Sequence, residues 1–158
     1  MQSHNTAFLV LILIYLESEM SKIKWSDKLS VGVDEIDTQH KELIKIANAL
    51  IHAVKTNKKE RTINNVIKKL REYTVFHFNS EEKLMKRKNY DSYTEHSVEH
   101  KKLKKTVQQF QRSIYEGEQV SPTDLFMFMK TWLLKHILES DQKFSVFLSK
   151  KDNTEVEQ

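Results

Sequence analysis

The sequence predicts an all-α protein, an antiparallel up-down-up-down four-helix bundle with an extended N-terminal arm. Only 2 glycines and 1 proline occur in 158 residues, too few for the closely spaced turns of a β-sandwich or barrel. Hydrophobic residues make up 39% of the chain and charged residues 30%, which is enough apolar content for one core. Four long segments repeat apolar residues at three- and four-residue steps, the period of an amphipathic helix.

The helical segments are expected at about residues 38–56, 60–86, 93–116 and 122–148. The connections between them are short, which makes consecutive helices antiparallel neighbours. Ser92 and Glu95 have the spacing of a capping box at the start of the third helix. Ser121 before Pro122 is typical of a capped helix start, and Gly117 suits the end of the preceding helix.

The chain divides into residues 1–20, a bundle over residues 21–150 and a polar tail over residues 151–158. Residues 21–37 alternate apolar and polar side chains, and we expect an extended arm that lies on the bundle. The apolar run Ala7–Leu16 is too short to span a bilayer, and the absence of Lys and Arg before it argues against a signal peptide. It is either a weak membrane-directed or docking helix, or a product of start-site choice with Met20 as the true beginning, which we favour.

Composition excludes several classes of function. The chain has no cysteine, so disulfides, thiolate zinc sites, iron–sulfur clusters and a cysteine nucleophile are ruled out. The formal net charge of +4 includes 22 acidic residues and does not argue for nucleic-acid binding. We expect a cytoplasmic protein without stable membrane insertion, and the sequence identifies no protein partner.

Polar residues interrupt the apolar stripes of all four helices. The inward positions are occupied by His40, His77, Glu81, His96, His100 and His136. One inward histidine is usually a hydrogen-bonded core residue, but five would leave many unsatisfied groups, each costing about 1–3 kcal/mol. Neutral imidazole is a good ligand for iron, copper and zinc. The pattern therefore predicts a metal site inside the bundle.

The spacing of these residues indicates more than one ion. His77 and Glu81 are four residues apart, as are His96 and His100, so each pair lies on one helix face. Five imidazoles with carboxylates exceed the four ligands of tetrahedral zinc and fit two ions of higher coordination number.

Asp141 is the ligand with the least support from spacing. It follows His136 by five residues, which in a regular α-helix turns it by about 140° around the axis. A π-bulge, a feature common at functional sites, would bring it back to the same face.

Four motifs together resemble the hemerythrin family, and specifically its single-domain bacterial members. They are Leu29–Val33 with Asp37–His40, then His77–Met85, then His96-x3-His100, and finally Trp132–Ile137 with Asp141. The resemblance covers about residues 24–148. It implies a four-helix bundle that holds two iron ions in a non-haem centre and binds dioxygen reversibly, for carriage, storage or delivery, and not as an enzyme.

The resemblance also implies roles for individual residues. His96, His100 and His136 would ligate one iron, His40 and His77 the other, and Glu81 and Asp141 would bridge them. The iron with two imidazoles would keep a vacant position for dioxygen. The apolar oxygen pocket of the family corresponds to Leu43, Phe78, Trp132, Leu133 and Ile137.

Other interpretations fit less well or stay open. A ferritin-like oxidase takes its ligands from Glu-x-x-His pairs, and no glutamate lies three residues before a histidine. His96-x-x-Glu99-His100 matches a zinc-hydrolase pattern with Glu99 as the base, but it leaves the other three inward histidines unexplained, and we expect Glu99 to face solvent. A sensor, or a scavenger of peroxide or nitric oxide, would use the same ligands as an oxygen carrier.

Overall fold

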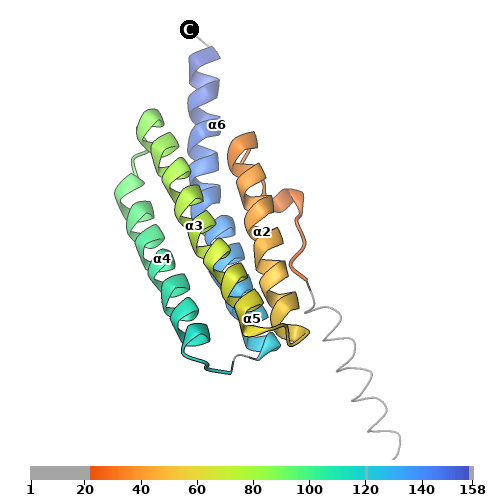
Figure 1. The fold of residues 1–158 in the computed structure, drawn as a ribbon. Helices are drawn as coiled ribbons and strands as arrows, with labels where there is room; N and C mark the ends of the chain where they lie inside the picture. Colours follow the sequence, from red (N-terminus) through yellow and green to blue (C-terminus); the bar gives the residue numbers. More distant parts are fainter. Residues whose placement is uncertain (1–21, 120, 157–158) are drawn as a thin grey trace, which may run out of the picture.

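The computed structural model describes residues 22–119 and 121–156, and these form a four-helix bundle (Figure 1). The first three helices are α2 (Asp34–Lys55), α3 (Glu60–Lys88) and α4 (Tyr93–Tyr115). The fourth begins as α5 (Pro122–Met129), continues through the π-helical turns η2 (Lys130–Leu134) and η3 (Ile137–Asp141), and ends as α6 (Gln142–Val156). The all-α bundle predicted from the sequence is confirmed. The backbone of residues 151–156, within the stretch predicted as a tail, continues α6.

The segment before α2 is the predicted arm, interrupted by a short 3₁₀ turn, η1 (Asp27–Leu29). Leu29 and Val31 are buried. The Asn48 side chain on α2 accepts from the backbone N–H of Ile23 and donates to its carbonyl oxygen, both at 2.8 Å. These contacts hold the arm against α2, as expected.

The helix α2 begins at Asp34, four residues earlier than predicted. Acidic residues in its first turn are favoured by the positive end of the helix dipole. The Asp37 carboxylate also accepts from Ser30 Oγ at 2.5 Å and from the Val31 N–H at 2.8 Å. Asp37 thus ties the start of α2 to the arm.

The predicted capping box at the start of α4 is wrong. Ser92 has φ −91° and ψ 22°, outside the extended region in which a capping hydroxyl reaches the free amides, and its side chain makes no cap bond. Ser121 is a cap as predicted, because its Oγ accepts from the Asp124 N–H at 3.1 Å. Gly117, just after α4, has φ +80°, a left-handed conformation that glycine adopts without strain.

Two apolar clusters lie along the bundle, and the polar residues that interrupt the helix stripes lie between them. The larger cluster includes Phe78, and the smaller contains Met85 and Phe144. On α3, Glu81 lies between Phe78 and Met85, and on the fourth helix Asp141 comes three residues before Phe144. The polar residues are therefore closed off by packed side chains on both sides along the bundle.

The expectations for residues 1–20 lie outside the described residues. Over residues 22–119 and 121–156, no helix is long and apolar enough to cross a membrane.

Candidate metal centre

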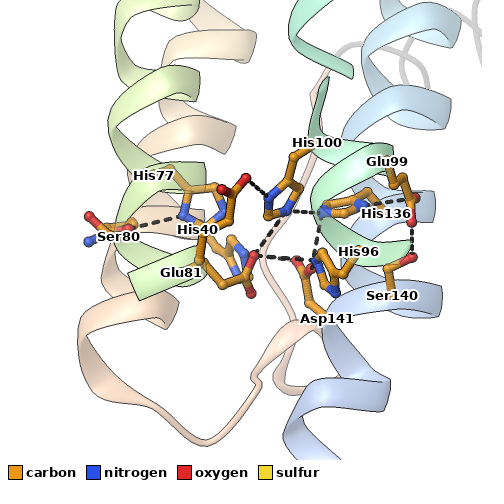
Figure 2. Close-up of polar contacts among 12 residues, drawn as sticks. His40, His77, Ser80, Glu81, His96, Glu99, His100, His136, Ser140 and Asp141 are labelled. Atoms are coloured by element: carbon orange, nitrogen blue, oxygen red, sulfur yellow. Dashed lines mark hydrogen bonds and ion pairs between the residues drawn. The ribbon is translucent and has the colours of Figure 1, made fainter. Parts of the chain in front are cut away.

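All four helices contribute to one buried polar cluster (Figure 2). α2 supplies His40, α3 supplies His77 and Glu81, α4 supplies His96 and His100, and the fourth helix supplies His136 and Asp141. None of these seven residues is more than 5% exposed. The structure thus brings together every residue that the sequence predicted as a ligand.

Five of the seven residues form one group. Ligand atoms of Glu81, His96, His100, His136 and Asp141 all lie within 4.8 Å of one another. Asp141 Oδ1 is 3.0 Å from His136 Nε2 and 3.1 Å from His96 Nε2. Glu81 Oε2 is 3.2 Å from His100 Nε2. Three imidazoles and two carboxylates therefore face one point.

A second, smaller group shares one residue with the first. It consists of His40, His77 and Asp141. Asp141 Oδ2 lies 3.2 Å from His40 Nε2, while Oδ1 faces the histidines of the first group. The two oxygens of one carboxylate therefore face two neighbouring sets of imidazoles, the arrangement expected of a residue that bridges two metal ions.

The π-helical turn η3 explains how Asp141 reaches the cluster. Its wider turn compensates for the five-residue separation from His136, which in a regular α-helix would point Asp141 away. The π-helical turn that Asp141 needs in order to reach the other ligands is therefore present.

The buried nitrogen and oxygen atoms of the cluster are suited to bind a metal, because the protein leaves many of them without hydrogen bonds. Among the described residues, eight buried side-chain atoms make no hydrogen bond, and seven of them belong to the cluster, where imidazoles and carboxylates contact one another only as ion pairs. These seven are His40 Nδ1 and Nε2, Glu81 Oε1 and Oε2, His96 Nε2, and Asp141 Oδ1 and Oδ2. An unpaired buried polar atom costs about 1–3 kcal/mol, more when charged. Imidazole and carboxylate together suit iron, and bound cations would remove the cost.

Without metal, protons neutralise part of the cluster. Burial lowers the pKa of His136, but the nearby Asp141 carboxylate outweighs it and raises the value to about 10. The same competition between burial and the carboxylates of Asp141 and Glu81 raises the pKa of His96 to about 9. Burial raises the pKa of Glu81, yet the imidazoles of His100 and His96 bring it down to about 2. Metal binding would displace protons from these rings.

Side chains around the cluster contact the outer nitrogens of His77 and His100. His77 Nδ1 lies 3.0 Å from Gln39 Oε1, and His100 Nδ1 lies 3.0 Å from Glu82 Oε1. Such contacts fix the tautomer and orientation of a metal-binding imidazole. The contact between Gln39 and a ligand histidine was not predicted from the sequence. The available signal was the position of Gln39 directly before His40 on the same helix.

Glu99 corrects an expectation, because it does not simply face solvent. Its Oε1 lies 2.9 Å from His136 Nδ1, and its Oε2 accepts from Ser140 Oγ at 2.5 Å. The carboxylate points to the outer nitrogen of His136, so it is engaged as a partner of that ring. This geometry argues against Glu99 as the free base of a zinc hydrolase.

The five residues predicted to line an oxygen pocket are all buried and belong to the larger apolar cluster. The Phe78 ring stacks on the His100 imidazole, with centroids 3.9 Å apart and planes 9° from parallel. Trp132 donates from Nε1 to the Leu103 carbonyl at 3.2 Å, which links η2 to α4. His52 lies outside the cluster and is exposed.

Comparisons with known proteins agree with this geometry. The Hemerythrin HHE cation binding domain matches residues 31–147. The bacteriohemerythrin of Stenotrophomonas maltophilia is 32% identical over 126 residues, 80% of this chain and 81% of that protein. The bacteriohemerythrin of Clostridium acetobutylicum is 32% identical over 124 residues, 76% of this chain and 96% of that protein. A crystal structure of wild-type hemerythrin superposes with a TM-score of 0.73 at 30% identity, covering 80% of this chain and 98% of that one.

Proposed function

Because this chain belongs to the hemerythrin family, which binds a di-iron centre, we propose that it binds dioxygen reversibly at that centre. In this proposal one iron is held by His96, His100 and His136, with Glu81 and Asp141. The other iron is held by His40 and His77, with Asp141 shared between the two. Glu81, expected to be a second bridge, has its ligand atoms in the first group only.

The two groups offer different numbers of ligand residues, and this difference is the main support for the proposal. The first group offers five ligand residues, whereas the second offers two histidines and one carboxylate. Two histidines and one carboxylate leave an iron with open coordination positions, and non-haem iron with such open positions can bind dioxygen. The second iron is therefore the proposed place of dioxygen binding, where two ferrous ions would supply electrons to the bound dioxygen.

The surrounding side chains favour release of dioxygen over its chemical conversion. Leu43 and Ile137 are fully buried, and Phe78 and Leu133 are less than 5% exposed. These residues carry no acid or base, and their burial would exclude water on the side of the centre that they cover. The hydrophobic shell around a metal controls solvent access and local dielectric, and here it would protect the ferrous state from oxidation.

The test is an anaerobic titration with ferrous iron, followed by cycles of air and argon. We expect about two irons per chain, and an absorption band in the visible that appears with air and bleaches under argon through repeated cycles. One iron per chain, or a preference for a lone zinc, would contradict the di-iron assignment. A band that is lost after one exposure, with release of peroxide, would indicate an oxidase or a scavenger.

A further inference from the structure

Glu99 connects α4 to the segment of the fourth helix that carries Asp141. It lies on α4, directly before His100 in sequence. One of its carboxylate oxygens faces His136 Nδ1 at 2.9 Å, and the other accepts from Ser140 Oγ at 2.5 Å (Figure 2). His136 directly precedes the turn η3, and Ser140 directly precedes Asp141 within it. One carboxylate therefore contacts η3 near both of its ends.

The turn η3 requires a stabilising contact of this kind because it is π-helical. A π-helical turn is rare because it is less favourable than the α-helix around it. If the turn relaxed to an α-helix, Asp141 would lie about 140° around the helix axis from His136. The present geometry keeps His136 Nε2 and Asp141 Oδ1 3.0 Å apart, so a contact that holds η3 also holds two proposed ligands in register.

Glu99 also lies where solvent comes nearest to the histidines. Its side chain is 40% exposed, compared with 18% for Glu82, which holds His100 in the same way. It lines a surface hollow of about 580 Å³ together with His136 and Trp132. It lines a second hollow of about 260 Å³ together with His96. The bonds of Glu99 are therefore the ones most open to competition from water.

We infer that Glu99 is a positioning residue of the metal centre, which holds η3 from α4 through His136 and Ser140 and thereby slows the loss of iron. A hydrogen bond to a charged carboxylate is about twice as strong as one between neutral groups, so the glutamate does more than a neutral acceptor would. This inference rests on the di-iron centre of the proposed function, and not on reversible binding of dioxygen.

The test measures the rate at which a ferrous chelator removes iron from the anaerobic, fully loaded protein. In Glu99→Ala we expect release to be about 10–100-fold faster, the usual effect of losing a partner of a ligating histidine. Glu99→Gln should release iron more slowly than Glu99→Ala but faster than the wild type, because its amide oxygen still accepts from His136 Nδ1. Ser140→Ala, which removes one of the two contacts, should have a smaller effect than Glu99→Ala.

Glu139→Gln is the matched control, since Glu139 lies on the same turn, is exposed and carries the same charge. It should release iron at the wild-type rate, and circular dichroism should show that all variants keep the helices of the wild type. Release from Glu99→Ala within twofold of the wild type, or equal acceleration by Glu139→Gln, would overturn the inference. If Glu99→Ala does not fold, unchanged release from both Glu99→Gln and Ser140→Ala would overturn it.

The same experiment separates the inference from the proposed function. A wild-type protein that takes up two irons but does not bind dioxygen reversibly would refute the function and leave the role of Glu99 standing. A wild-type protein that takes up no iron would refute both.

Discussion

Gln39 Oε1 lies 3.0 Å from His77 Nδ1, across the contact between α2 and α3. An amide oxygen only accepts hydrogen bonds, so Nδ1 carries the proton and Nε2 keeps its lone pair. Burial lowers the pKa of His77 to about 3, and the ring is therefore neutral. The ring is thus held in the protonation state and tautomer that a metal ligand requires, even before metal is bound.

Replacing Gln39 with alanine should weaken iron binding at the two-histidine group by about 10–100-fold, because the His77 ring loses the partner that fixes its tautomer. Anaerobic iron titration should show one tight and one weakened site. Gln108→Ala, at an exposed position on α4, should bind iron as the wild type does. Two unchanged sites in Gln39→Ala would show that the amide does not orient His77.

Asp141 is common to both groups of potential ligands among the described residues. Asp141→Ala should therefore reduce iron uptake from two ions per chain to one or fewer, since each group loses a carboxylate oxygen. Circular dichroism should confirm the helices, and iron content should be measured after removal of excess metal. Asp91→Ala, in the exposed loop before α4, should retain two irons. Full occupancy in Asp141→Ala would contradict its bridging role.

Leu133 lies in the larger apolar cluster and is 4% exposed. Leu133→Ala should admit water toward the centre and speed oxidation to the diferric form. The truncation should also lower the free energy of unfolding by about 2–5 kcal/mol, which denaturant unfolding measures. Oxidation rates should be compared only after circular dichroism shows that the variant is folded. An unchanged rate in a folded variant would show that Leu133 does not guard the site.

Alkaline pH should destabilise the metal-free protein. Burial disfavours the charged forms of His96 and His136, but nearby carboxylates outweigh it and raise the pKa values from 6.5 to about 9 and about 10. Folded protein then holds protons that the unfolded chain has released. The stability from these two rings is complete below about pH 6.5 and is lost as the pH rises to about 10. Melting temperatures that stay flat over this range would contradict the ion pairs.

Acid should destabilise the metal-free protein for the opposite reason. Burial lowers the pKa of His77 from 6.5 to about 3. Between these pH values the unfolded chain is protonated at His77, whereas the folded ring stays neutral. Burial opposes ionisation of Glu81, but His100 and His96 lower its pKa from 4.5 to about 2, so its contribution is lost as the pH falls through that window. Melting temperature should therefore fall from about pH 6.5 downward. A melting temperature that holds steady down to about pH 3 would contradict the buried, neutral His77.

Much of the fold and of the candidate site was predictable because the periodicity of the helices determines which residues face inward. The stripes that place apolar residues inward also place His40, His77 and His100 inward, since all of them follow the same 3.6-residue repeat. Short connections make consecutive helices antiparallel. The convergence of imidazoles from different helices follows from these two features alone.

The remaining features depend on which side chains meet across helices, and no local pattern encodes that. Glu99 looks like a surface residue on its own helix, and only the packing of α4 beside η3 brings its carboxylate to His136 and Ser140. The backbone at Ser92 does not have capping geometry, although Ser92 and Glu95 have the spacing of a capping box. The sequence by itself determined the bundle and the residues that point inward, because helix period and burial are local properties. Only the tertiary structure decided which side chains contact the outer histidine nitrogens, and that the two oxygens of Asp141 face different imidazoles. These contacts between helices depend on how neighbouring helices are packed.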